Sequence, residues 1–94
     1  MVAVELPDGL RFVRTAGPFT AESLPPGLRR THHVAANTWA RLRVLDGDVH
    51  FTLESDPPVD VDLHAGDEHA IPPLVPHRVS LSDGAAIAVD FFAA

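Results

Sequence analysis

Residues 66–77, Gly-Asp-Glu-His-Ala-Ile-Pro-Pro-Leu-Val-Pro-His, predict a short strand, a proline-rich turn and the start of a second strand. The first strand is expected to end at Ile71, because Pro72 and Pro73 have no backbone N–H to donate to a sheet. His77 then begins the second strand directly after a third proline. This order is expected to bring an imidazole to the mouth of a small β-barrel, where ligand-binding and metal chemistry commonly occur.

The rest of the chain predicts more short strands of the same kind. Its nine prolines separate runs that are too short for ordinary helices. Asp46-Gly47 is a strong signal for a two-residue hairpin turn of type I′, which needs positive φ at both central residues. Phe19 to Gly27 is expected to be a connection that prolines interrupt. Eight strands are expected, at Arg11–Thr15, Leu28–Val34, Thr38–Leu45, Val49–Glu54, Val59–His64, Glu68–Ile71, His77–Leu81 and Ala85–Phe92.

Length and composition predict one ordered domain spanning residues 1–94, with a core at about residues 10–92. The chain has 94 residues, of which 46% are hydrophobic and 21% charged, and this balance is typical of a globular protein. Many short strands with regular turns favour an all-β sandwich or barrel. A domain this small with exposed strand edges is also expected to form a homodimer.

Charge and residue usage exclude several classes of function. The formal charge is −6 and all seven basic residues are arginines, so neither a nucleic-acid partner nor a membrane partner is expected. The chain has no cysteine, which excludes disulfides, thiol catalysis and cysteine-bound zinc. No signal peptide or membrane span is recognisable, and a cytoplasmic protein is therefore expected.

Six histidines in a chain without cysteine raise the possibility of a metal site. His77 shares its strand face with Val79 and Leu81, so its ring is expected to face the interior. It is read as a ligand or, alternatively, as a core imidazole bonded to a backbone carbonyl. His69 has the same parity as Ile71 and is either a third ligand or a packed side chain.

The other four histidines divide by strand parity. His32 and His33 are adjacent, so only one of them can face the interior of a strand pair, and that one is a candidate ligand. His50 lies opposite the apolar face of its strand, and His64 shares a face with two aspartates. Both are expected to point into solvent, although Asp60, Asp62 and His64 could alternatively suggest a second metal site.

Two further residues stand out against apolar surroundings. Asp90 interrupts an otherwise apolar strand, and a buried carboxylate needs a partner, so it is predicted to pair with Arg41 or Arg43 in a structural role. Trp39 is expected to pack at the rim of the barrel or to line the pocket.

Two segments of the chain resemble the cupin superfamily. Residues 66–77 resemble its second conserved motif, and the run from His32 to Gly47 resembles its first. In cupins the first motif usually supplies two histidines and one acidic or amide ligand. Here the acidic position falls at or near Ala40 and the second histidine near Ala35, so the usual ligand set is incomplete.

A closer resemblance is to the TehB/YeaR-like small cupins that are associated with tellurite resistance. It is carried by the residues around Trp39 and Gly47, by the Pro-Pro pair before His77, and by the closing Asp-Phe-Phe. The resemblance implies a cupin-type double-stranded β-helix, or jelly-roll barrel. It also implies a divalent metal ion, either zinc or iron, nickel or manganese. The candidate metal ligands are His32, His77, His33 and His69.

Two functions from different classes follow from these observations. The first is a small metal-binding cupin that binds or senses a small molecule or an oxyanion in a tellurite or stress response. The alternative is a metal-free ligand-binding or protein-interaction module with the same barrel. No complete catalytic set is visible, so the sequence leaves open whether the protein is an enzyme.

Overall fold

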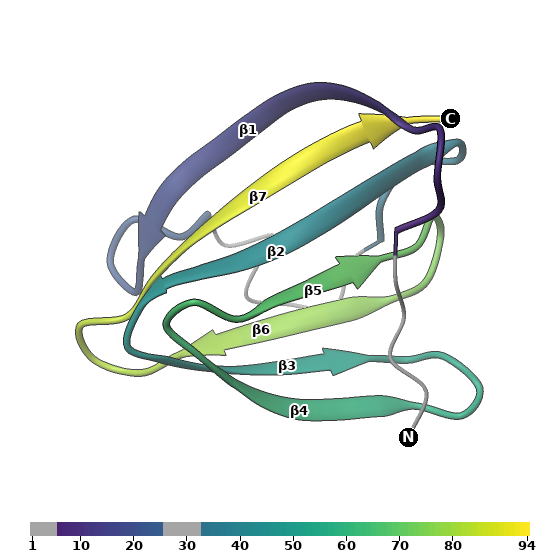
Figure 1. Ribbon diagram of the computed structural model, residues 1–94. Coiled ribbons are helices and arrows are strands. Elements are labelled where there is room, and N and C mark those ends of the chain that lie inside the picture. The colour runs from purple at the N-terminus through teal and green to yellow at the C-terminus, as the bar shows by residue number, and fades with distance from the viewer. Residues whose placement is uncertain (1–5, 26–32) are drawn as a thin grey trace.

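The computed structural model describes residues 6–25 and 33–94, which form an all-β fold of two antiparallel sheets (Figure 1). The first sheet has the strand order β1-β7-β2-β5, and the second has the order β4-β3-β6. Within these residues no helix is long and apolar enough to cross a membrane. The strands found in these two ranges are β1 (Arg11–Thr20), β2 (Thr38–Asp46), β3 (Asp48–Leu53), β4 (Val59–His64), β5 (Glu68–Ile71), β6 (His77–Leu81) and β7 (Ala86–Ala93).

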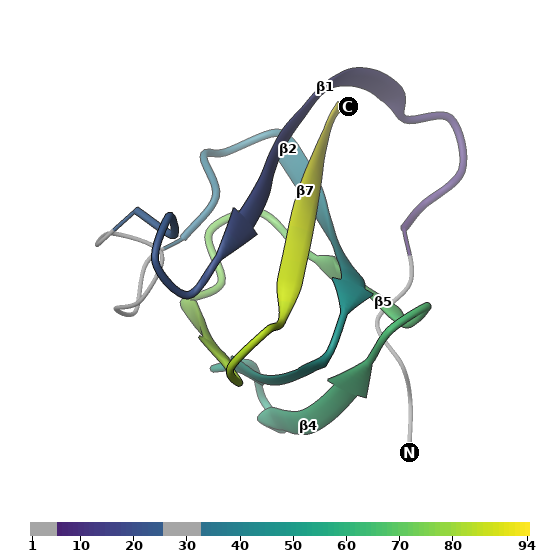
Figure 2. The ribbon, with the colours of Figure 1, turned by 90° about the vertical axis from the view of Figure 1, so that its left-hand side faces the viewer.

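The two sheets curve around a common interior, as Figure 2 shows in a view along the strands. The chain passes repeatedly from one sheet to the other, so that among the described strands only β3 and β4 are both consecutive and paired. This is the jelly-roll arrangement expected from the sequence, although the sheets are not joined into a closed barrel. The first described strand, β1, and the last, β7, lie side by side.

The core follows the period-2 alternation of the strands. Phe51 and Leu53 of β3 are fully buried, and they belong to the same cluster as Leu42 of β2 and Ile87 of β7. Burial of each of these side chains contributes roughly 1.5–3 kcal/mol to the free energy of unfolding. The alternation of apolar and polar residues in β3 and β4 was therefore a reliable guide to their inner faces.

The turn at Asp46-Gly47 is not the predicted hairpin. β2 and β3 belong to different sheets, and Asp46 is not among the described residues with positive φ. Gly47 has φ +70°, and a Cβ at this position would lie 2.8 Å from Cα of Ala85. The close approach of these two backbones explains why the chain changes sheets at a glycine.

The first strand is longer than predicted, and the strand expected at residues 28–34 is not seen where it can be tested. β1 continues to Thr20 because a bulge between Ala16 and Phe19 absorbs Gly17 and Pro18, after which pairing with β7 resumes. The expected connection from Phe19 therefore begins two residues later. Residues 28–32 lie outside the described residues, and His33 and Val34 lie in a connection rather than in a strand.

Candidate functional site

A cavity of about 400 Å³ lies between the two sheets, and its wall is almost entirely apolar. Both sheets contribute to it, and β1, β2 and β7 supply most of its described side chains. Arg14 and His77 are the two described lining residues that carry polar side-chain atoms. The described lining residues are Arg14, Ala16, Phe19, Pro25, Val34, Ala40, Leu42, Ile71, His77, Val79, Ile87, Val89 and Phe91.

His77 is the buried polar side chain of this wall. It is 3% exposed at the start of β6, and its Nδ1 lies 3.1 Å from the carbonyl oxygen of Val75. Because a carbonyl only accepts, Nδ1 carries the proton, and in the neutral ring the acceptor lone pair then belongs to Nε2. A bond from one ring nitrogen to a backbone carbonyl is common for metal-binding histidines. The inward orientation predicted from parity is confirmed, and so is the bond to a backbone carbonyl.

His69 lies near His77 but is not among the described residues of the cavity wall. The His69 and His77 rings both pack against Phe51, with centroid distances of 5.0 and 6.2 Å. The Nδ1 of His69 donates to the carbonyl oxygen of its neighbour Ala70 at 2.7 Å. His69 is half-buried, so it fits the packed alternative.

The remaining two candidate ligands do not complete a described metal site. His33 is exposed, and its Nδ1 lies 3.4 Å from the carbonyl oxygen of Val34. His32 lies outside the described residues. In the described ranges no group of three His, Asp or Glu side chains is close enough to hold a metal ion. The described candidate ligands are therefore isolated imidazoles, and among them His77 lies on the cavity wall.

Ala40 lies on the cavity wall and is fully buried. It is at or near the position at which the cupin pattern has an acidic or amide ligand, so the cavity wall has a methyl group there, consistent with the incomplete ligand set expected from the sequence. Ala35, near which the second histidine would fall, is exposed. The side chain of Trp39 is half-buried and is absent from the described lining residues, which leaves rim packing as its role.

Arg14 is the functional candidate that the sequence analysis missed. It is exposed on β1, and its guanidinium carbon lies 4.5 Å from the ring centroid of Phe91, another residue of the cavity wall. A cation over an aromatic face is attracted by the ring and held in position. The available signal was parity, because Arg14 is two residues from Ala16 along the strand and both line the cavity wall.

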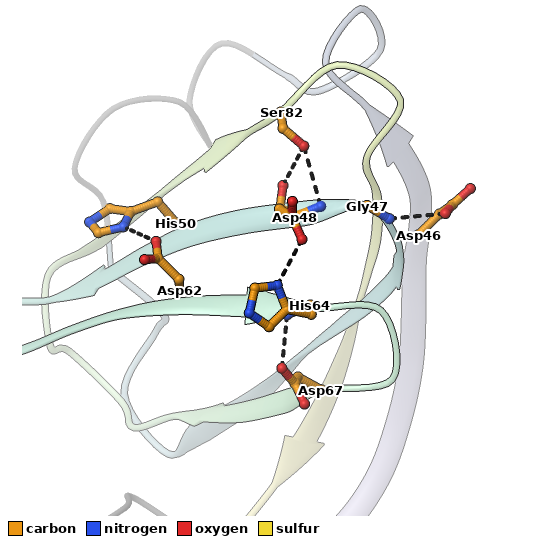
Figure 3. A network of polar contacts seen from close by, with 8 residues as sticks. All are labelled: Asp46, Gly47, Asp48, His50, Asp62, His64, Asp67 and Ser82. Carbon is orange, nitrogen blue, oxygen red and sulfur yellow. Dashed lines mark hydrogen bonds and ion pairs between the residues drawn. The ribbon is translucent and has the colours of Figure 1, made fainter.

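The outer face of the β4-β3-β6 sheet carries a ladder of histidines and aspartates (Figure 3). His50 and Asp62 are directly opposite on β3 and β4, and Nδ1 of His50 lies 2.7 Å from Oδ1 of Asp62. His64 stands opposite Asp48 at the same distance. Nε2 of His50 also pairs with Asp60. Both histidines are exposed, as predicted.

Hydrogen bonds to aspartate raise the pKa of both exposed histidines. The bond to Asp62 is the main cause for His50, and the bond to Asp48 is the main cause for His64. The nearby negative charges act in the same direction, because they favour the protonated ring. The face is thus a solvated acidic surface, as expected, in which histidines supply the positive partners.

Asp90 is on the outer face of the four-stranded sheet, and the cavity lies against the inner face. It accepts hydrogen bonds from Arg41, Arg43 and Thr15, so its predicted pairing with an arginine is confirmed for both candidates. Burial acts to raise the pKa of Asp90, but the bonds from Arg43, Thr15 and Arg41 outweigh it and lower the pKa to about 2. This cluster is structural, since it faces away from the cavity residues of β7.

The TehB-like domain model matches residues 14–89 of this chain. The chain belongs to the TehB-like domain family. No curated protein matches it in sequence. The matched segment begins at Arg14 and includes His77 and the described cavity residues except Phe91.

Solved structures agree with this TehB-like domain in fold. A protein from E. coli strain K12 superposes with a TM-score of 0.87 at 22% identity, covering 97% of both chains. TehB from Haemophilus influenzae gives a TM-score of 0.80 at 22% identity, covering 92% of this chain and 32% of TehB. Oxalate decarboxylase from Bacillus subtilis, described with Mn(II) centres, gives 0.58 at 18% identity over 69% of this chain and 17% of its own. The fold is therefore a cupin fold, and it is shared with an oxalate decarboxylase that is described with Mn(II) centres.

Proposed function

We propose that this TehB-like domain binds a small molecule or an oxyanion in the cavity between its sheets, with a divalent metal ion at His77. The observation that carries the proposal is a buried imidazole on the wall of a cavity of about 400 Å³. Cavities of roughly 300–1,000 Å³ with a few polar groups are typical of small-ligand sites. His32, His33 and His69 are the candidates for completing the metal ligands. The TehB/YeaR-like small cupins are associated with tellurite resistance, so tellurite is the first oxyanion to test.

A bound divalent ion would polarise a ligand oxygen, and this is the chemistry that it would supply at this site. The contribution of the chain itself is to hold the ring of His77 in place. The Nδ1–H bond to the Val75 carbonyl fixes the tautomer, and packing against Phe51 limits the rotation of the ring. The described wall around His77 is almost entirely apolar, and polar contacts are stronger in surroundings of low polarity.

The test is metal analysis and calorimetry on untagged protein after exposure to zinc, iron or manganese. One equivalent of metal is expected, and His77→Ala should lose it, whereas the exposed His64→Ala should keep it. Because His77 is buried, His77→Gln serves as a second variant that retains most of the side-chain volume. A protein that takes up no stoichiometric metal after loading would contradict the metal part of the proposal.

A metal-free binding domain is the second candidate, and Ala40 is the observation that favours it. A buried methyl group on the wall cannot replace the acidic ligand of the cupin pattern. In this case His77 would bond directly to the ligand. Changing His77→Gln should then weaken ligand binding while the metal content stays at zero in both proteins.

We also propose that the domain functions as a homodimer. β1 pairs with β7 on one side, and its residues Phe12 and Val13 are 55% and 50% exposed. Long apolar edge strands are commonly covered by a partner. Light scattering should give twice the mass of the chain, and Val13→Glu should shift the protein to a monomer.

A further inference from the structure

We propose that the ligand of the cavity is an amphipathic anion, with an apolar body between the sheets and an anionic group at Arg14. This inference deepens the proposed function and rests on it, because it assumes that the cavity is a ligand site. It distinguishes the ligand from a bare inorganic oxyanion and from a neutral apolar molecule.

The walls argue against a small hydrated ion in the body of the cavity. Eleven of the thirteen described lining residues are apolar, among them Phe19, Leu42 and Ile87. Moving a charged group into such surroundings without compensating donors costs far more than it gains. Contact with these side chains instead favours a ligand with substantial hydrocarbon surface, which gains from leaving water.

Arg14 adds a positive charge to this otherwise mostly apolar wall. Its guanidinium presents a planar set of donors that fits a carboxylate or a phosphate with two parallel bonds. Its guanidinium carbon lies 4.5 Å from the ring centroid of Phe91, so the guanidinium is held against a residue of the cavity wall. An anionic group there would remain partly hydrated, because Arg14 is exposed.

The arginine is also not neutralised by the carboxylates of the described residues. The ion pairs between arginine and carboxylate in residues 6–25 and 33–94 use Arg41, Arg43 and Arg78. Asp90, the buried carboxylate of the neighbouring strand, is bound by Arg41 and Arg43 on the other side of the sheet. An incoming anion at Arg14 therefore has no described carboxylate to displace.

The position of the two polar groups sets the direction of the ligand. Arg14 is on β1 in the four-stranded sheet, and His77 is on β6 in the three-stranded sheet. A ligand that fills the cavity contacts both sheets, with its charged end at β1 and its body against residues such as Ala16 and Val79.

Calorimetry with three probes tests the inference: octanoate has both features, 1-octanol lacks the charge, and inorganic phosphate lacks the apolar body. Octanoate is expected to bind about three- to tenfold more tightly than octanol, the range of a partly exposed charge-assisted bond. Arg14→Gln should remove this difference, whereas Arg11→Gln, an exposed arginine of the same strand that is absent from the described cavity wall, should preserve it. Phosphate should bind measurably weaker than octanoate.

A variant that fills the cavity separates this inference from the proposed function. Ala16→Leu should weaken octanoate and octanol together, and Val79→Phe is the second such variant if Ala16→Leu does not fold. Equal binding of octanoate and octanol, or no effect of Arg14→Gln, would overturn the inference while leaving the cavity a ligand site. Phosphate binding that depends on His77, with no octanoate binding, would also overturn it. Failure of all three probes and of metal uptake would overturn both proposals.

Discussion

Arg43 contacts both carboxylate oxygens of Asp90, with Nε 2.8 Å from Oδ2 and Nη2 3.1 Å from Oδ1. Arg41 shares Oδ2, and Thr15 donates to Oδ1 at 2.6 Å. Three strands, β1, β2 and β7, are thereby tied together at one buried carboxylate. The hydrogen bond to Asp90 is the main reason why the pKa of Arg43 is raised, so the pair remains ionised over a wide range of pH.

We expect Asp90→Asn to lower the free energy of unfolding by about 2 kcal/mol at neutral pH, from the difference between a pKa of 3.8 and one of about 2. A lowered pKa stabilises the fold above about pH 4, and this stabilisation disappears as the pH falls through about 2. Urea denaturation at pH 7 and between pH 4 and 2 measures both effects. The wild-type protein should lose stability across the acidic range, and the variant should lose less.

The matched control for this prediction is Asp8→Asn, because Asp8 is an exposed residue ahead of β1. It should leave the stability within about 0.5 kcal/mol of wild type. If Asp90→Asn behaved like this control, the hydrogen bonds of Asp90 would not contribute measurably to the stability of the fold.

The histidine ladder on the other sheet should respond to pH in the opposite direction. The pKa values of His50 and His64 are raised by their aspartates, so the stabilisation is present below about pH 6.5 and is lost as the pH rises through the folded values. NMR titration should give both rings a pKa above that of a free histidine. Asp62→Asn should lower the pKa of His50 more than that of His64.

Asp48→Asn provides the reciprocal test, since Asp48 faces His64. It should lower the pKa of His64 while His50 keeps most of its shift. If each substitution affected both histidines equally, the local hydrogen bonds would not be the main cause of the shifts.

Gly47→Ala should destabilise the fold more than Gly84→Ala does. Both glycines have positive φ, +70° and +78°, so an alanine at either is strained by roughly 1–2 kcal/mol. A Cβ on Gly47 would also lie 2.8 Å from Cα of Ala85, whereas one on Gly84 would meet nothing within 4 Å. We expect the difference in unfolding free energy to be about 1–3 kcal/mol, as for overpacking in a core. Equal losses in thermal or urea unfolding would show that the backbone near Ala85 moves away at little cost.

Phe51 should be important both for stability and for the orientation of two histidines. Phe51→Ala is expected to cost about 3–5 kcal/mol, because the side chain is fully buried. Phe51→Leu should be milder and should remain folded. Its NMR spectrum should show altered ring signals of His69 and His77, which pack on Phe51, and an unchanged signal of the exposed His64. Unchanged signals of all three would mean that Phe51 does not hold these rings.

The faces of most strands could be predicted because alternation is a local property. Val59 and Leu63 point inward and Asp60 outward for reasons that the sequence of β4 alone contains. Strand pairing was harder, because Asp-Gly is equally suited to a hairpin and to a corner between sheets. The contact of Gly47 with Ala85 decides between them, and no local pattern reveals it.

The candidate site was predicted in part for a similar reason. His77 lies in a short regular strand after prolines, so its parity could be counted and its inward orientation was correct. Arg14 lies between two register shifts of β1, at Phe12/Arg14 and at Ala16/Phe19, and such irregularities make counting unreliable. His33 was assigned to a strand, whereas it lies in a connection. The set of residues that line the cavity depends on which strands face one another, and the whole fold determines this arrangement.

The pairing of β1 with β7 has a consequence for biosynthesis. Arg11 is opposite Ala93, and β7 separates β1 from β2 in the sheet. While the ribosome is still making β7, the earlier strands β1 and β2 have no shared neighbour. The β3–β4 pair is the described unit that can form from nearby residues, so it is the natural starting point, and the larger sheet cannot be completed until β7 has been made.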